Sequence, residues 1–296
     1  MLARVVTGGF NKLRRNKLVS SIYHEARLRL ANKGNQEPIL IYQMGKVGSS
    51  SILDSLRAAK LDRPIFHIHF LNPQNIQRAE DILLRSFGRH GSVNRWGIYE
   101  SRFVTRHFLH RQNARLKIIS LVREPVARNV SSFFANVDMF VPDCAVRYEA
   151  GEIGIAELTQ HYLRDFHEHN HPLDWFDDEM KAVFGIDVFS SEDLEYRDHG
   201  TFVYKRGEVQ LLVLRLEDMD TVAPLALQRY LAVDGIALTK ANQAHDKDYD
   251  RAYRDFRKKL ELPADYLAKM YESKFANFFY SGPELERFRS YWSSHR

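Results

Sequence analysis

The sequence is almost without cysteine. Cys144 is the single cysteine among 296 residues, so an internal disulfide framework is excluded. Chains without disulfides typically work in a reducing compartment. A lone cysteine is more often a small buried hydrophobe than a nucleophile, and nothing near Cys144 in the sequence favours catalysis. We therefore expect a structural role for this thiol.

Long hydrophobic runs are also missing. No stretch approaches the ~20 apolar residues of a membrane span, and the N-terminal sequence MLARVVTGGFNKLRR lacks a signal-peptide hydrophobic core. These absences predict a cytoplasmic protein. The hydrophobic content of 44% is nevertheless sufficient for a sizeable core.

Acidic residues are scarce at the N-terminus. Residues 1–34 have eight Lys and Arg against one acid, Glu25, a net charge of +7, which leaves −2 for residues 35–296 because the whole chain carries +5. We therefore divide the chain into a basic arm, 1–34, and one domain, 35–296. The arm is a solvated leader helix in the plainest interpretation and a peripheral membrane contact in the other. We expect no nucleic-acid partner, and the oligomeric state stays open.

Short apolar runs alternate with helical patterns in the rest of the chain. This alternation predicts an α/β fold with three layers, a central and mostly parallel sheet, and a helix-rich C-terminal part. Ligands of such sheets bind beyond the carboxyl ends of the strands. We expect strands at 38–43, 64–70, 115–122 and twice within 201–219, and helices at 51–60, at 73–87, from Pro125, in two pieces of 152–185 broken by NHP, and through most of 217–296.

The stretch YQMGKVGSSSILDSL, residues 42–56, joins the first strand to the first helix of this domain. Glycines let the backbone approach an anion, and the first amides of a helix are unpaired donors. Lys46 adds a full positive charge, although a nucleoside-triphosphate loop would place its lysine after the second glycine. We predict an anion site here, and we expect Ser51 and Asp54 to cap the start of the helix. A glycine turn with serine caps and a surface lysine is the alternative.

Arg123 directly follows the third predicted strand, at a position where magnesium-dependent nucleotide enzymes usually have an acidic residue. An arginine forks onto phosphate oxygens and does not bind metal. Ser131 follows eight residues later, with Arg128 one turn before it, so the segment predicts a second anion-binding corner. The alternative partner for Arg123 is a neighbouring acid such as Glu124.

Taken together, QMGKVGSSSI and LVREPVARNVSSFF resemble the two cofactor signatures of the sulfotransferase superfamily. The resemblance covers about residues 38–219 and implies a P-loop-like sulfotransferase fold, 3′-phosphoadenosine 5′-phosphosulfate as the donor and no metal. It also implies which residues hold the donor: Lys46, Val47, Gly48, Ser49, Ser50 and Ser51 for the 5′-phosphosulfate, and Arg123 and Ser131 for the 3′-phosphate. Gly45 departs from the family, many of whose members have proline there; we expect a looser turn with its donors in place.

Further stretches narrow the resemblance. LLVLRLEDM resembles the late strand of the family that ends in Glu-Asp, and TFVYKRG resembles, more weakly, the loop over the adenosine. PLDWFD and FGIDVF within 172–189, and YESKFANFFY at 271–280, resemble bacterial capsular polysaccharide synthesis proteins. The resemblance thus implies a carbohydrate as the acceptor.

The acceptor hydroxyl requires a base. His67 and His69 in FHIHFLN lie on one face of a strand because they are two residues apart, and a neutral imidazole suits removal of a hydroxyl proton. Several carbohydrate sulfotransferases carry a similar His-x-His, which gives the role of base to His69 and a supporting role to His67. Two packed strand histidines are the structural alternative, and Glu100 is a weaker alternative base.

Two observations remain outside this scheme. The histidines of HEHNH, 167–171, are spaced so that they would not share a helix face, and we expect no metal there. Trp175 and Phe176 in DWFDDEM are expected in the core or against a sugar-binding cleft. Three functions are therefore weighed: a sulfotransferase acting on a carbohydrate, a magnesium-dependent kinase on a similar scaffold, and a catalytically idle nucleotide-binding component of polysaccharide assembly.

Overall fold

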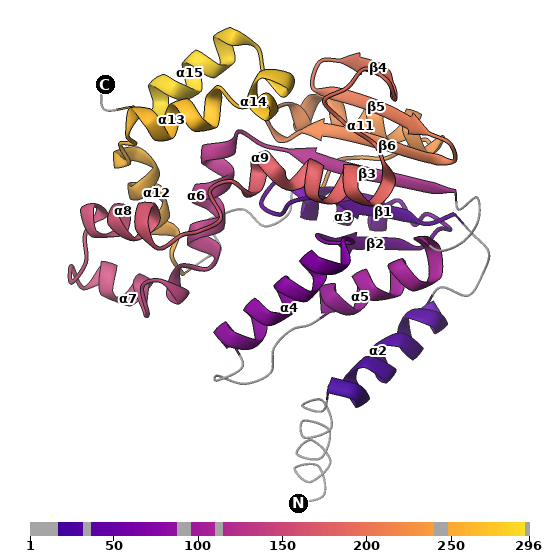
Figure 1. Cartoon of the computed structure of the whole chain (residues 1–296), viewed down its shortest axis with the longest axis horizontal. Helices are drawn as coiled ribbons and strands as arrows, with labels where there is room; N and C mark the ends of the chain where they lie inside the picture. Colours follow the sequence, from indigo (N-terminus) through magenta and orange to yellow (C-terminus); the bar gives the residue numbers. More distant parts are fainter. Residues whose placement is uncertain (1–16, 32–36, 88–95, 110–114, 240–247, 294–296) are drawn as a thin grey trace, which may run out of the picture.

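The computed structural model describes residues 17–31, 37–87, 96–109, 115–239 and 248–293 (Figure 1). Six strands form one sheet in the order β2-β1-β3-β6-β5-β4. The first four in that order run parallel, and β5 and β4 are antiparallel to their neighbours. The strands are β1 Ile39–Tyr42, β2 Ile65–Ile68, β3 Leu116–Val122, β4 Leu194–Asp198, β5 Thr201–Arg206 and β6 Val209–Arg215.

Helices flank the sheet, and α3 packs on β1, α5 on β2 and α11 on β6. The α-helices are α2 Lys17–Ala31, α3 Ser49–Ala58, α4 Pro73–Phe87, α5 Trp96–Val104, α6 Pro125–Ala135, α7 Cys144–Glu149, α8 Ile155–Arg164, α9 His171–Trp175, α10 Ala182–Phe184, α11 Met219–Leu231, α12 Asp250–Lys259, α13 Ala264–Tyr271, α14 Lys274–Phe279 and α15 Gly282–Trp292. Figure 1 shows α13, α14 and α15 together beyond one end of the sheet, with α2 on the far side of α5.

The sheet is covered on both faces. All four residues of β1 are fully buried, and side chains of a strand alternate between faces, so neither face of β1 is open. This burial explains why the strand reads as a continuous apolar run. The predicted α/β fold with a mostly parallel central sheet is therefore confirmed. Among the helices that the structure describes, none is long and apolar enough to cross a membrane.

Most predicted elements occur where the sequence places them. Strand β4 was missed because its segment, LEYRD, is largely exposed and lacks an apolar pattern. The predicted break at NHP is also displaced. The chain leaves the helix after Arg164 and re-enters one at His171, with Pro172 in the first turn of α9, where its missing amide donor costs no hydrogen bond.

Cys144 is buried, as expected for a structural thiol. Burial raises its pKa to about 11, and the nearby Asp138 carboxylate adds to the shift. The thiol is therefore protonated at neutral pH and is a poor nucleophile.

A buried carboxylate joins the end of β3 to the C-terminal helices. Glu124 caps α6 by accepting hydrogen bonds from the amides of Val126 and Ala127, both at 2.7 Å. The same carboxylate accepts from the hydroxyl of Tyr271 at 2.7 Å and from the indole of Trp292 at 3.3 Å. Burial raises the pKa of Glu124. A buried carboxylate with four donors is stable only while those donors remain.

We expect Tyr271→Phe to lower the free energy of unfolding by about 1–3 kcal/mol, because it leaves the buried Glu124 carboxylate without one of its donors. Urea denaturation measures this loss. Tyr196→Phe is the matched control: it removes a hydrogen bond to Asp198 at the surface and should change the free energy by less than about 0.5 kcal/mol. Equal effects of the two variants would contradict a structural role for the Tyr271–Glu124 bond.

Candidate active site

The turn between β1 and α3, residues 43–49, is here named the Lys46 loop. It turns with three left-handed residues: Gly45 with φ 79°, Lys46 with φ 62° and Gly48 with φ 84°. Glycine adopts this conformation freely, whereas a residue with a Cβ is strained by roughly 1–2 kcal/mol. Strained residues persist where their surroundings fix them, and they cluster at binding sites. The conformation of Lys46 therefore marks the loop as a candidate site.

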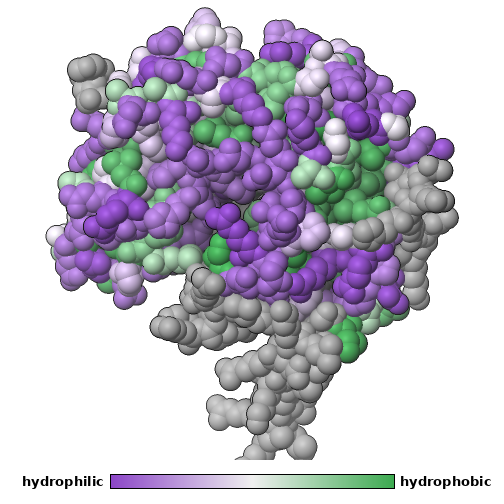
Figure 2. Space-filling model, viewed as in Figure 1, coloured by the Kyte–Doolittle hydropathy of each residue, from purple (hydrophilic) through white to green (hydrophobic). Residues whose placement is uncertain are grey.

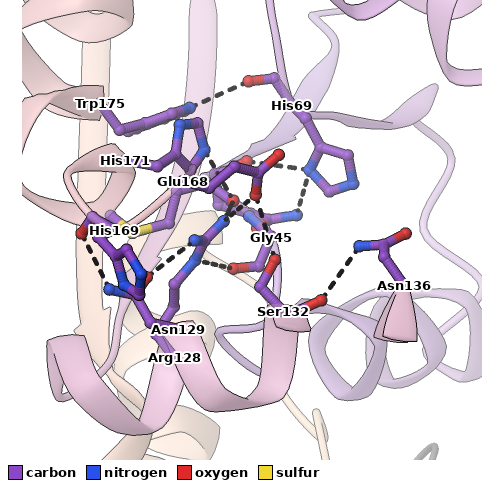
Figure 3. A network of polar contacts seen from close by, with 12 residues as sticks. Gly45, His69, Arg128, Asn129, Ser132, Asn136, Glu168, His169, His171 and Trp175 are labelled. Carbon is purple, nitrogen blue, oxygen red and sulfur yellow. Dashed lines mark hydrogen bonds and ion pairs between the residues drawn. The ribbon is translucent and has the colours of Figure 1, made fainter. Parts of the chain in front are cut away.

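Two arginines fix the loop by binding its carbonyl groups, and Figure 3 shows one of them, Arg128, beside Gly45. Arg128 donates from Nη2 to the carbonyl of Met44 at 3.0 Å and from Nε to that of Gly45 at 3.3 Å. Arg123 donates from Nη1 to the carbonyl of Lys46 at 3.1 Å. Arg128 is only 2% exposed, and burial lowers its pKa to about 10. It therefore stays charged at neutral pH and binds the loop carbonyls from the buried side.

The orientation of these carbonyls decides where the amides point. In a trans peptide the N–H lies opposite the preceding C=O. Because the carbonyls of Gly45 and Lys46 face the arginines, the amides of Lys46 and Val47 face away from them. The side chain of Val47 is fully buried, so any contact of this residue with a ligand would be made by its backbone.

Helix α3 begins earlier than the capping pattern predicted. Its N-cap is Gly48, without a side-chain cap, and Ser51 lies inside the helix. The predicted cap by Ser51 and Asp54 is therefore wrong. The amide of Ser51 donates to the carbonyl of Gly48 at 3.1 Å, so it already has an acceptor. The first two amides of α3, those of Ser49 and Ser50, carry the partial positive charge of the helix terminus.

The predicted pair of histidines meets the Lys46 loop. The hydroxyl of Ser49 lies 2.8 Å from Nε2 of His67, and the side-chain nitrogen of Gln43 lies 3.1 Å from the same atom. Nδ1 of His69 lies 3.0 Å from the carbonyl oxygen of Gln43 and 3.0 Å from its side-chain nitrogen. In the tautomer whose Nδ1 donates to this carbonyl, Nε2 keeps its lone pair.

His69 and His67 are both neutral at physiological pH. Desolvation lowers the pKa of His69, and the positive charges of Lys46 and Arg128 lower it further, against the opposing effect of the Gln43 carbonyl. Burial lowers the pKa of His67 to about 4. His69 keeps an exposed surface whereas His67 is partly buried and bonded to Ser49. Of the two, His69 is the one that an acceptor can reach.

Two residues that the sequence did not assign to the site support it from α9. The indole of Trp175 donates to the carbonyl of His69 at 3.1 Å, and Nε2 of His171 donates to the carbonyl of Met44 at 3.2 Å. Burial, with the charge of Arg128, lowers the pKa of His171 to about 3. HEHNH was tested only as a metal site, and Trp175 was expected in the core or against a sugar-binding cleft, so the sequence assigned neither His171 nor Trp175 to this site.

The histidines of HEHNH serve different parts of the structure. His169 lies 2.8 Å from the hydroxyl of Tyr266 and 2.9 Å from the carbonyl of Tyr162, whereas His171 faces the Lys46 loop. In the part of the chain that the structure describes, no group of three or more metal-ligating side chains comes together. Trp175 and Phe176 are both 1% exposed and belong to the core.

The second predicted corner is partly assembled. Arg123 contacts the Lys46 loop, and Glu124 is not its partner because that carboxylate points into the core. Ser131 is half-buried on α6, the helix that starts directly after Glu124. Arg128, predicted beside Ser131 as an anion-binding residue, instead directs its guanidinium at the loop carbonyls.

Glu100 is a poor base in this structure. It lies in α5, the helix on β2, and is only 8% exposed. A carboxylate so deeply buried offers little access to an acceptor hydroxyl, whereas His69 keeps an exposed surface. The geometry favours His69 over Glu100.

The two glycines of the Lys46 loop are held by different constraints. Proline at position 45 would need φ near −65°, far from the 79° of Gly45, so the loop here follows another path than a proline-containing one. The amide of Gly45 already donates to the side-chain oxygen of Gln43, so this donor is not left in place for a ligand. A Cβ on Gly48 would lie 2.5 Å from Leu216, whereas one on Gly45 would meet nothing closer than 4.0 Å.

We expect Gly48→Ala to lower the free energy of unfolding by about 1–3 kcal/mol more than Gly45→Ala. Both variants strain a left-handed residue by about the same amount, so their difference isolates the contact with Leu216. Chemical denaturation of the two proteins measures it. If the two losses are equal, Leu216 yields without cost and the close approach does not constrain the loop.

Comparison with known proteins supports part of the resemblance. Residues 156–281 match a family described as "Putative capsular polysaccharide synthesis protein". No curated protein and no solved structure matches the chain. The matched range contains α9 with His171 and Trp175, and it ends just after the 271–280 segment. The similarity to capsular polysaccharide synthesis proteins is therefore confirmed over residues 156–281. This range includes neither the Lys46 loop nor Arg123.

Proposed function

We propose that the chain is a sulfotransferase that moves a sulfuryl group from 3′-phosphoadenosine 5′-phosphosulfate to a hydroxyl of a carbohydrate. One observation carries the proposal. The Lys46 loop, His69 and Arg123 lie at the carboxyl ends of β1, β2 and β3, three neighbouring parallel strands, and hydrogen bonds connect them. This is where open α/β sheets bind their ligands.

The residues fit a ligand with two anionic ends. Arg123 touches the backbone of Lys46 at 3.1 Å, so two cationic side chains start from adjacent positions at one edge of the sheet. The amides of Lys46 and Val47 face away from the arginines, and α3 presents an N-terminus without a side-chain cap. Main-chain donors with a lysine and an arginine suit a doubly phosphorylated nucleotide.

Each residue then has a definite task. When bound, the donor supplies a sulfuryl group attached to a phosphate that can leave. Lys46 and the first amides of α3 stabilise the negative charge that grows on this phosphate as the sulfur–oxygen bond breaks. Nε2 of His69 accepts the proton of the acceptor hydroxyl while the oxygen of that hydroxyl bonds to sulfur. Gln43 and Trp175 hold His69 in place through the contacts described above.

A carbohydrate acceptor is supported by the family description. The matched segment is described by the words capsular polysaccharide synthesis, and it supplies Trp175, which binds the backbone of His69. The part of the chain that resembles this family thus lies against the proposed base. The proposal extends the family's description to the acceptor of this chain.

Calorimetry separates the sulfotransferase from a kinase. We expect adenosine 3′,5′-bisphosphate to bind without magnesium and ATP with magnesium to bind much more weakly. Lys46→Ala should weaken binding of the bisphosphate by at least about tenfold, because one charge-assisted hydrogen bond contributes about 1.5–3 kcal/mol, and should abolish transfer. Lys259→Ala, at an exposed lysine at the end of α12, is the control and should change neither.

Two results would contradict the proposal. Tighter binding of ATP with magnesium would favour the kinase. Tight binding of the bisphosphate without transfer from the sulfuryl donor to any capsular polysaccharide or oligosaccharide would favour the catalytically idle component.

The role of His69 can be tested through the pH dependence of the rate. His69→Asn keeps a donor near the Gln43 carbonyl but removes Nε2, so we expect the transfer rate to fall by about 10²–10⁴ with little change in nucleotide affinity. In the unchanged protein the rate should fall with decreasing pH only below about 6.5, since the pKa of His69 is lowered and the neutral form is the active one. Steady-state rates across pH measure both effects.

The matched control is His199→Asn at the surface, where the histidine side chain is 91% exposed. This variant should leave the rate unchanged. A parallel fall in rate and nucleotide affinity in His69→Asn would assign His69 a structural role instead.

A further inference from the structure

Helix α2 is fixed to the domain by one side. Leu28 is 4% exposed, and the ring of His24 stacks on that of Tyr99 in α5 with centroids 4.6 Å apart. Glu25 lies 2.6 Å from His107 and 3.0 Å from Arg106. These contacts hold the inner side of α2 against α5 and the turn that follows it. The opposite side therefore has a defined direction, away from the domain.

The outward side of α2 carries large apolar residues. Ile22 is 61% exposed, Leu30 64% and Tyr23 49%. Ile22, Ala26 and Leu30 follow one another at intervals of four residues, so they form a stripe along the helix, with Tyr23 beside it. We name these four residues the α2 outer strip. Figure 2 shows a small hydrophobic area at the lower right, where Figure 1 draws α2.

Basic residues border the α2 outer strip. In helical projection Arg29 falls on one side of it and Arg27 on the other; both are exposed. The acid of this helix, Glu25, contacts His107 and Arg106, and it also accepts a hydrogen bond from Nε of Arg29 at 3.1 Å. The helix keeps a net positive charge, because its lysine and two arginines outnumber this single carboxylate.

The sequence adjoining the helix has the same sign of charge. Residues 1–16 contain Arg4, Lys12, Arg14 and Arg15 and no acidic residue. Together with α2, this makes residues 1–31 a segment with a net charge of +6, attached to a remainder of nearly balanced charge.

We propose that the α2 outer strip docks on an anionic membrane surface. A helix that lies in the interface of a bilayer has an apolar face bordered by lysines and arginines. The apolar side chains enter the acyl boundary, and the arginines at the edges extend toward lipid phosphates. The α2 outer strip has this arrangement, and its inner face is already occupied by the domain, so the helix is oriented before it meets the bilayer.

Charge complementarity favours a membrane over a second copy of the chain. Two α2 helices that met through their outer strips would bring two segments of +6 together, and like charges repel at such contacts. An anionic bilayer instead attracts each Lys or Arg near its surface, with a free energy of about 1 kcal/mol per residue. The net charge of residues 1–31 thus favours an anionic lipid surface over a second copy of the chain.

Vesicle flotation of the full chain tests the proposal. We expect the protein to float with vesicles of phosphatidylcholine mixed with phosphatidylglycerol, to float much less with phosphatidylcholine alone, and to be released by high salt. The double substitution Ile22→Ser, Leu30→Ser should weaken binding by at least about tenfold, since it removes two large side chains from the apolar contact.

The matched control is Val146→Ser, Leu225→Ser, which changes two apolar residues that are 70% and 52% exposed on other helices. It should bind vesicles as the unchanged protein does. Leu30→Glu is a second variant that adds a repelling charge to the strip and should also weaken binding. Circular dichroism of each variant checks that the fold is intact.

Three results would overturn the proposal. The unchanged protein fails to float with anionic vesicles; the strip variants float as well as the control; or Ile22→Ser, Leu30→Ser converts a dimer to a monomer on size exclusion without changing flotation. The last result would assign the strip to contact between two copies. None of these outcomes depends on sulfuryl transfer, so the proposed function is tested separately.

Discussion

The bond between the Arg128 guanidinium and two loop carbonyls is the contact on which the site depends. A backbone that turns through three left-handed residues in four positions has no regular hydrogen-bonding pattern of its own. Arg128 supplies that pattern from a buried position, binding Met44 and Gly45, and the amide of Lys46 turns outward as a result. A buried cation is costly unless it is fully bonded. The loop and the arginine therefore stabilise each other.

The C-terminal helices, although far from the Lys46 loop in sequence, hold the strand end beside it. Tyr271 binds Glu124, whose own amide donates to Glu217 at 2.7 Å, and Glu217 in turn accepts from Tyr280 at 3.0 Å. These bonds fix the junction of β3 and α6, the point from which Arg123 reaches the Lys46 loop. The tyrosines of the 271–280 segment, which resembles capsular polysaccharide synthesis proteins, thus support the strand end that carries Arg123.

Local patterns predicted the sheet and the strand ends, because a buried parallel strand such as β1 is an unbroken apolar run and the Lys46 loop lies at its end. They did not predict β4, which is exposed, or the direction of Arg128. Which atom a buried arginine binds depends on where distant backbone carbonyls lie, and spacing alone contains no such information. His171 and Trp175 were overlooked for the same reason: their partners, Met44 and His69, are more than one hundred residues away in sequence.

The positive charges of the site affect both of its proposed tasks, binding of the anionic donor and proton removal by His69. Desolvation lowers the pKa of His69 most, and the charges of Lys46 and Arg128 lower it further. The cations that would attract an anion therefore also help to keep the imidazole unprotonated. On the proposed function, a doubly phosphorylated donor neutralises part of this positive field when it binds. The same event makes His69 a stronger base, since a protonated imidazole is then less strongly repelled. Basicity would therefore rise only in the complex that can use it, and a histidine without cationic neighbours would lack this dependence.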